Sequence, residues 1–499
     1  MKYSELKRQR LRVGLSLSLI LLLQLYCAPQ DPIEEGRRVL EQAAEAMGGV
    51  AALGEIETLS RQGTKQRSSL GQARVASERL YVQPTRPYTQ IIDFTVPREV
   101  ELSGSGGSIR VTDWVKGGYN RDSRSLRIAQ IRQLGGYKKE WDRDIAHFLV
   151  HALGEESQIE GISEGMVEER PHRVVSVRYI DGVLYQVYVD DSTHLISKLE
   201  FTEDRTPYGD LAKERIFSDY REVGNVKLPF SQVTKEMNLV TEVRTFSEMS
   251  VNGEIQEDLF EIPEEAREEA AALAHLDTIP VKAIELAEGV YFGSAGQSNM
   301  WVEFEDFILV ADGPTNEMQS LEVIRQIRNT VGDKPIRYVV TTHHHADHQG
   351  GIRTYAAEGA TIVTHALNEA VMREFLTRPH TLKPDRYSQS NQEPQIELVT
   401  DRRTITDGSR TVELMHLPNP HTDGYLVIYL PQEKLIFESD LFEILEGEAW
   451  PPLVRPEAKV FYEVVTEVGW KVDRIVSGHG RVVEWQELID AIQASETSD

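Results

Sequence analysis

The most chemically informative stretch of this chain is THHHADHQGG, in which His343, His345, Asp347 and His348 follow the pattern His-x-His-x-Asp-His. Imidazole nitrogens and carboxylate oxygens are ligands that zinc takes in proteins at neutral pH. Residues spaced by two in an extended loop point to one side, so His343 and His345 can bind the same ion. Asp347 and His348 turn out of the loop and can face a second metal, and one carboxylate can bridge both ions.

Three groups of the same chemistry follow later in the chain: His421 in LPNPHTDGY, Asp440 in LIFESDLF and His479 in IVSGHG. Each stands at or shortly after the end of a predicted strand, so we expect all three at the same sheet edge as the histidine motif. The histidines that fall off this pattern are predicted to be ordinary hydrogen-bonded residues: His344, His365 and His416. Seven predicted ligands exceed the four that a closed structural zinc site needs, which favours a two-ion site.

The elements around these residues alternate between strands and helices. Short apolar runs predict strands over residues 336–342, 360–365, 412–417, 425–430, 434–440 and 473–478. Helical spacing predicts helices over residues 352–358, where Gly359 ends the run, and 458–468. This order predicts an α/β fold in which a β-sheet sandwich is flanked by helices.

The motif and its three later partners resemble the metallo-β-lactamase superfamily, and the resemblance covers about Ile284 to Ile492. It implies an αβ/βα sandwich and a dinuclear zinc metallo-hydrolase. Residue by residue, it places the first zinc ion on His343, His345 and His421, and the second on Asp347, His348 and His479. Asp440 would bridge the two ions. Asp312 in FILVADG matches an aspartate that supports the histidine loop without touching the metal.

The mechanism that the resemblance implies needs no protein nucleophile. Two cations lower the pKa of a shared water, and the metal-bound hydroxide attacks the carbonyl of an ester, a lactone or a related bond. Asp347 is the predicted catalytic residue, because it can orient the hydroxide or pass a proton to the leaving group.

Two positions bear on the substrate. Zinc β-lactamases place cysteine or serine near the position of Asp440, so β-lactamase activity is kept only as an alternative. Acyl-homoserine lactonases carry tyrosine three residues after the bridging aspartate, where this chain has Glu443. Glyoxalase II acts on glutathione thioesters inside cells, which an exported enzyme would not meet. The sequence therefore predicts a small-molecule substrate, with an apolar one among the options, and leaves its identity open.

The first half of the chain predicts a different fold. An opening helix is expected from Asp31 to Met47, followed by short alternating segments typical of antiparallel strands. From Gln186 to Pro263 this pattern of strands and turns resembles that of the half-open barrel of periplasmic lipoprotein carriers of the LolA and LolB type. We therefore predict two domains, a half-barrel over 31–263 and a hydrolase domain over 280–497, joined by a linker over 264–279. A second hypothesis follows, in which the chain is an exported carrier of an apolar ligand with an accessory zinc domain.

The N-terminus predicts export. Basic residues from Lys2 to Arg12 precede the apolar run from Leu15 to Cys27, which is too short to span a bilayer as a permanent helix. Residues 1–28 are thus a predicted signal peptide or lipoprotein signal, and the alternatives are lipidation of Cys27, cleavage after Ala28 and an uncleaved anchor. The expected location is the periplasm, or the outer membrane or cell surface as a lipoprotein. Because the net charge is −26, no nucleic-acid partner is expected, and membrane contact only through a lipid at Cys27.

Overall fold

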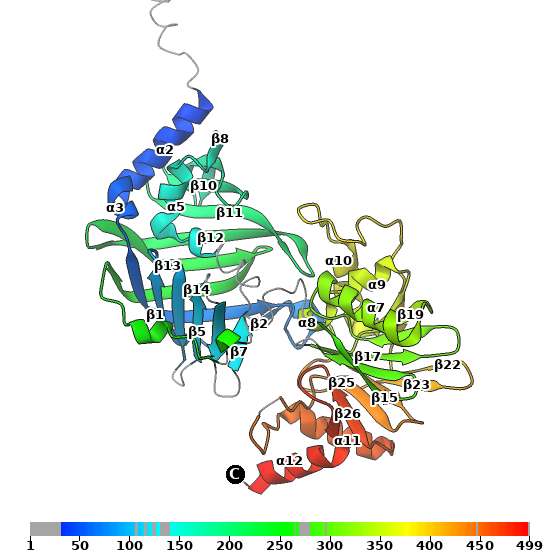
Figure 1. The fold of residues 1–499 in the computed structure, drawn as a ribbon. Coiled ribbons are helices and arrows are strands. Elements are labelled where there is room, and N and C mark those ends of the chain that lie inside the picture. Colours follow the sequence, from blue (N-terminus) through cyan, green and yellow to red (C-terminus); the bar gives the residue numbers. More distant parts are fainter. Residues whose placement is uncertain are drawn as a thin grey trace, which may run out of the picture. The chain divides into compact units, whose positions relative to one another are not determined.

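The computed structural model describes residues 31–104, 108–113, 117–121, 126–129, 140–264, 266–268, 280–294, 297–445 and 448–497 (Figure 1). The predicted export signal with Cys27 and most of the predicted linker over 264–279 lie outside these residues. The export signal and the domain boundary therefore stay predictions. Within the described ranges, no helix is both long enough and apolar enough to span a membrane.

The chain forms two compact units that do not follow the order of the sequence. The first unit contains Met1–Ile56, Asp142–Phe201 and Ile216–Pro229. The second unit contains Glu57–Trp141, Thr202–Arg215 and Phe230–Asp499. Three strands contribute residues to both units: β11 (Ile196–Arg205), β12 (Gly209–Val223) and β13 (Val226–Glu236).

The first unit packs helices on antiparallel strands. Its helices are α2 (Pro32–Ala46), α3 (Val50–Gly54) and α5 (Ile145–Leu153). Its strands are β8 (Gln158–Val167), β9 (Arg170–Arg178) and β10 (Leu184–Asp190). Strand β8 pairs with β9, β9 pairs with β10, and β10 pairs with β11. The side chain of Asp31 caps α2 by accepting from the backbone nitrogen of Ile33 at 3.0 Å. Val39, Leu40 and Ala43 are buried where α2 contacts β8 and β9, which confirms the predicted opening helix.

The second unit begins with a run of antiparallel strands. In chain order they are β1 (Thr58–Leu70), β2 (Leu80–Val82), β3 (Arg86–Asp93), β4 (Arg98–Ser103), β5 (Ser108–Asp113), β6 (Gly117–Arg121), β7 (Leu126–Ala129) and, much later, β14 (Leu239–Val251). Strand β1 pairs with both β3 and β14. Two short 3-10 turns, η1 (Ala76–Glu78) and η2 (Glu257–Phe260), flank these strands. The antiparallel sheet predicted for this half is confirmed, whereas its closure into a half-barrel stays a prediction.

The remainder of the second unit contains two further sheets. The first has the order β15 (Lys282–Ala287), β16 (Val290–Ser294), β17 (Ser298–Glu303), β18 (Ile308–Ala311), β19 (Ile336–Val340), β20 (Thr361–His365) and β21 (Ile396–Val399). The second has the order β22 (Arg402–Thr406), β23 (Thr411–His416), β24 (Leu426–Leu430), β25 (Leu435–Ser439), β26 (Arg474–Ser477) and β27 (Val483–Glu484).

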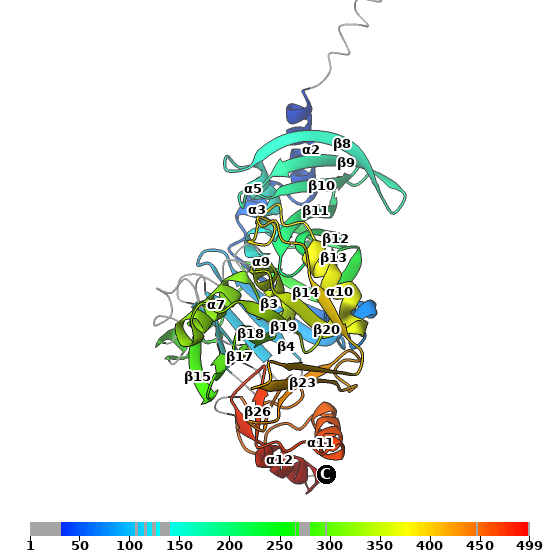
Figure 2. The same cartoon turned by 90° about the vertical axis from the view of Figure 1, so that its right-hand side faces the viewer.

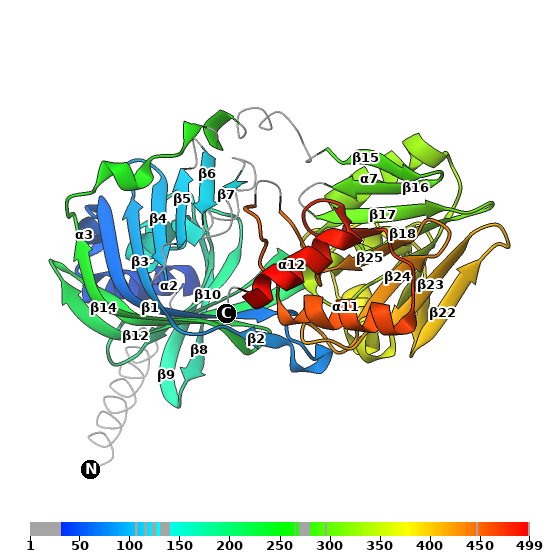
Figure 3. The ribbon, with the colours of Figure 1, turned by 90° about the horizontal axis from the view of Figure 1, so that it is seen from below.

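Helices cover the outer face of each of these sheets. Next to the first sheet lie α7 (Glu317–Val331), α9 (Ile352–Ala357) and α10 (Glu369–Thr377), with the short α8 (Ala346–Gln349) and η3 (Ala366–Asn368) in the loops. Next to the second sheet lie α11 (Pro456–Val468) and α12 (Trp485–Thr497), which contact each other (Figure 2, Figure 3). The expected α/β sandwich flanked by helices is therefore confirmed.

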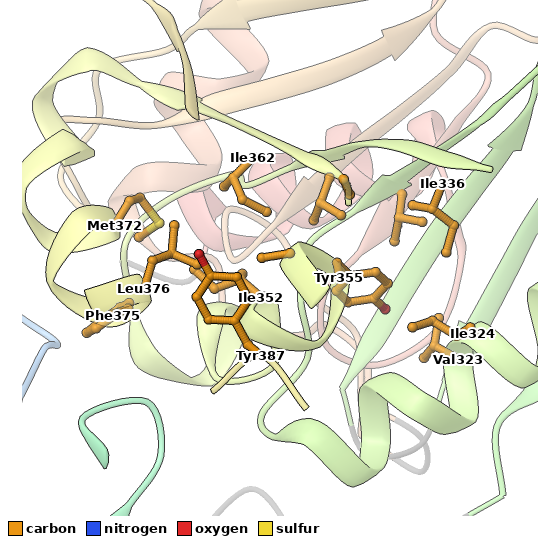
Figure 4. Packing of buried hydrophobic residues seen from close by; sticks show 14 of the residues in the cluster. Val323, Ile324, Ile336, Ile352, Tyr355, Ile362, Met372, Phe375, Leu376 and Tyr387 are labelled. Atoms are coloured by element: carbon orange, nitrogen blue, oxygen red, sulfur yellow. The ribbon is translucent and has the colours of Figure 1, made fainter. Parts of the chain in front are cut away.

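Strands buried on both faces hold this sandwich together. In β18, Leu309 points into the core between the two sheets, whereas Ile308 and Val310 point into the core beneath the helices. Figure 4 shows that second core, where Ile352 and Tyr355 of α9 lie among residues of α7 and α10. Two-sided burial explains why the strand sequences are continuous apolar runs rather than alternating ones.

Candidate metal centre

The histidine motif lies in the loop that leaves β19. The backbone is extended through His345 (φ −61°, ψ 139°), which precedes α8, and α8 then carries Asp347 and His348. The extended part brings the rings of His343 and His345 to a centroid distance of 4.5 Å. The turn into α8 redirects the next two side chains, as the spacing of the motif predicts.

The three later residues come from the ends of strands in the second sheet. His421 lies between β23 and β24, where Asn419 accepts from its backbone nitrogen at 2.8 Å. Asp440 directly follows β25 after Ser439, whose φ of 75° lies in the left-handed region. His479 follows β26 after Gly478, and a β-carbon there would lie 2.6 Å from the hydroxyl of Ser439. Glycine at 478 thus lets the two loops approach closely.

The structure brings all seven predicted residues together in two groups that could each hold a metal ion. His343, His345, His421 and Asp440 form the first group, and Asp347, His348, Asp440 and His479 form the second. The ligand atoms of each group lie within 4.8 Å of one another.

Asp440 belongs to both groups because its two oxygens face opposite ways. Its Oδ2 lies 3.2 Å from Nε2 of His421 and 3.7 Å from Nε2 of His343. Its Oδ1 lies 2.9 Å from Nε2 of His348 and 3.3 Å from Nε2 of His479. One carboxylate thus has one oxygen beside each group, which is the arrangement of a bridging ligand.

The spacing of these atoms fits tetrahedral zinc. Two nitrogens on one tetrahedral ion lie about 3.3 Å apart, because each Zn–N bond measures about 2.0–2.1 Å. Nε2 of His343 and Nε2 of His421 are 3.3 Å apart. The donor set of imidazoles and carboxylates also suits zinc better than calcium or magnesium, which prefer oxygen alone.

The pKa shifts of the site differ between its histidines. Burial lowers the pKa of His343 and His345 well below the usual value, so both rings are neutral and offer a lone pair. Burial also disfavours a charge on His348, but Asp440 and Asp347 outweigh it and hold its pKa well above the usual value. Burial opposes ionisation of Asp440 too, yet His348 holds its pKa well below the usual range.

A comparison with protein families decides the identity of this region. Residues 315–479 match the model of the metallo-β-lactamase superfamily, and the match includes all seven clustered residues. This region is a metallo-β-lactamase superfamily domain. Similar solved structures include a metallo-β-lactamase from Pontibacter korlensis, with 19% identity over 43% of this chain and 99% of that chain, at a TM-score of 0.34. FIM-1 from Pseudomonas aeruginosa has 18% identity over 45% of this chain and 98% of that chain, also at 0.34.

Asp312 supports the histidines of the metallo-β-lactamase domain from behind. Its Oδ1 accepts from the backbone nitrogen of Thr342 at 2.8 Å, and its Oδ2 accepts from the hydroxyl of Ser439 at 3.0 Å. The Thr342 hydroxyl lies 3.0 Å from Nδ1 of His343, and the Ser439 hydroxyl lies 2.8 Å from Nδ1 of His348. Because each Nδ1 has a partner, each Nε2 is left facing the centre.

Tyr425 and Gln349 also brace the domain's centre, and neither was predicted from the sequence. The ring of Tyr425 stacks on that of His343, with a centroid distance of 4.9 Å and an interplanar angle of 11°. Its hydroxyl accepts from the backbone nitrogen of Asp440 at 2.8 Å. Gln349 donates to the backbone oxygen of His343 at 2.6 Å. These contacts fix the ligands before any ion binds.

The histidines predicted to be ordinary lie outside both groups. His365 and His416 stack at a centroid distance of 3.8 Å, and their Nε2 atoms lie near backbone oxygens of Thr400 (3.2 Å) and Asp423 (2.8 Å). His344 belongs to neither ligand group, and burial lowers its pKa to about 4. All three have packing roles in the domain.

One side of the centre is closed by residues from the other half of the sequence. Gln72 donates from Nε2 to Oδ1 of Asp347 at 2.8 Å, and Nε2 of His345 lies 3.3 Å from the backbone oxygen of Ala73. Both residues belong to the same compact unit as the metallo-β-lactamase domain. The sequence carried no signal for them, because a contact across 275 positions leaves no local spacing.

Proposed function

We propose that this protein is a zinc-dependent hydrolase that holds two metal ions and acts on an ester, a lactone or a related bond of a small molecule. The observation that carries the proposal is the position of Asp440, whose two oxygens address two complete ligand groups. His343, His345 and His421 would hold one ion, and Asp347, His348 and His479 the other. Bound divalent cations would lower the pKa of a water molecule and stabilise negative charge on the substrate.

The side chains of this site would hold the ions in a fixed geometry and carry a proton. Asp440 and His343 are buried, so their geometry is fixed by the surrounding contacts. The side chain of Asp347 keeps 36% of its surface exposed, against 10% for Asp440. Asp347 is therefore the carboxylate that an entering substrate can reach, and it can hold a proton for the leaving group.

The alternative of an apolar-ligand carrier gains no support from the polar face of strands β1, β3 and β4. One face of these strands carries a buried polar network instead of an apolar surface. Arg61 donates to Gln90 at 3.3 Å, Gln90 donates to Glu99 at 3.1 Å, and Lys65 pairs with Glu101 at 3.1 Å. Hydrogen-bonded charges of this kind hold strands together but offer no apolar lining.

The proposed activity is tested with a hydrolysis panel on the full-length protein. Zinc-loaded protein is assayed on esters, lactones, thioesters, phosphodiesters and β-lactams, and the chelator-treated protein serves as the control. We expect turnover of at least one ester or lactone class that is lost with the metal and restored by zinc. Turnover that survives complete removal of the metal would contradict the proposal, and turnover of β-lactams alone would favour the β-lactamase alternative.

We further propose that the protein is exported, because basic residues and a short apolar run precede Cys27. Cell fractionation should find the protein outside the cytoplasm, in the periplasm or at the outer membrane. Replacing Cys27 with serine should abolish fatty-acid labelling if Cys27 is the lipidated residue. A full-length product confined to the cytosol would be the contrary result.

A further inference from the structure

The segment between β1 and η1 contacts both ligand groups of the metal centre. Gln72 donates to Oδ1 of Asp347, whereas Oδ2 of Asp347 lies 3.6 Å from Nε2 of His348 and 3.8 Å from Nε2 of His479. The amide therefore engages the oxygen that faces away from the second group. A carboxylate held in this way presents one defined oxygen to a cation.

The next residue acts on the first group. The backbone oxygen of Ala73 can only accept, so the contact with His345 places the proton of that ring on Nε2. Nδ1 of His345 is buried and has no hydrogen-bond partner among the described residues. A buried nitrogen with a free lone pair, beside three other convergent ligands, is suited to bind a cation.

The segment is anchored to the metallo-β-lactamase domain on both sides of Gln72. Leu70 belongs to the same buried cluster as Tyr208 and Phe375. Gly71 has a φ of 72°, and a β-carbon there would collide with the hydroxyl of Tyr208.

Two ion pairs anchor the segment beyond Gln72. Arg74 pairs with Asp423 at 2.9 Å, and Arg79 pairs with Glu374 at 2.7 Å. Gln72 is thus held in place by its neighbours and not only by its contact with Asp347.

We propose that residues 71–74 form an integral part of the metal centre, with Gln72 as the positioning residue for Asp347 and the Ala73 carbonyl as the partner that orients His345. This inference rests on the proposed metal-binding function. Under it, the N-terminal strands complete the active site instead of serving only as a separate binding module. The first effect to measure is on metal affinity, because both contacts act on ligands.

The test compares Gln72→Ala with Gln66→Ala in the full-length protein. Gln66 is the matched control, because it lies on β1 and donates to the backbone oxygen of Gln83 at 3.3 Å, away from the centre. Stepwise zinc affinities are measured by competition with a chelator, and the cobalt-substituted proteins are compared by their visible absorption. Thermal unfolding of the metal-free variants shows whether either substitution disturbs the fold.

We expect Gln72→Ala to weaken the ion held by the group that contains Asp347 by about 10- to 100-fold, the usual cost of losing a hydrogen-bond partner of a ligand. The cobalt spectrum should change, the metal-free unfolding temperature should stay at the wild-type value, and Gln66→Ala should match the wild type throughout. Wild-type affinity and spectrum in Gln72→Ala would overturn the inference, as would equal losses in both variants. A wild type that binds no metal would contradict the proposed function itself. A wild type that binds metal, together with an unaffected Gln72→Ala, would contradict only this inference.

Discussion

Replacing Asp440 with alanine should lower turnover by about 10²- to 10³-fold or more, the range seen when one preorganised electrostatic group is removed from an active site. The reason is that both oxygens of this carboxylate are engaged, one with each ligand group. The metal content should fall towards one ion per chain, because His343, His345 and His421 remain. Turnover is measured on the best substrate of the panel, and metal content by elemental analysis.

The control for this variant is Asp490→Ala, which removes an exposed carboxylate on α12. It should keep wild-type turnover and metal content. Circular dichroism of Asp440→Ala should show the wild-type secondary structure, because the substituted residue lies in a loop after β25. An Asp440→Ala protein with unchanged turnover would refute a bridging role for this residue.

Replacing Asp312 with alanine should destabilise the second unit by about 2–4 kcal/mol, although Asp312 belongs to neither ligand group. The substitution leaves the buried backbone nitrogen of Thr342 without its acceptor and frees the hydroxyls of Thr342 and Ser439. Those hydroxyls orient His343 and His348, so zinc affinity should also fall, by about 10- to 100-fold. Denaturant unfolding and chelator competition measure the two effects.

Asp306→Ala is the matched control, because Asp306 is exposed in the turn that leads into the same strand, β18. It should change neither stability nor affinity measurably. If Asp312→Ala unfolds during purification, Asp312→Asn provides a milder change that keeps the size of the side chain and alters only its hydrogen-bonding capacity. Wild-type zinc affinity in both variants would show that the network behind the histidines does not tune the centre.

The ligand groups were predictable from sequence because local chemistry and sheet geometry specify them. The motif from His343 to His348 has its own spacing, and Asp440 and His479 each follow a run of apolar residues that forms a buried strand. The carboxyl ends of such strands meet at one edge, so residues far apart in sequence converge there. The helices at Ile352–Ala357 and Pro456–Val468 were also predicted close to their observed bounds.

What the sequence concealed depends on contacts between distant segments. Gln72 and Ala73 follow a strand with no unusual composition, and only the folded chain brings them to Asp347 and His345. The sequence also did not predict that β11, β12 and β13 each contribute residues to both compact units. A strand of alternating residues shows which face is buried but not which neighbour covers it.

The most direct test of the central claim is the zinc content of the purified, full-length wild-type protein, measured by elemental analysis after equilibration with zinc and removal of the excess. Two ligand groups that share Asp440 predict about two ions per chain, both released together with activity by a strong chelator. One tightly held ion at saturating zinc, or none, would contradict the two-ion centre.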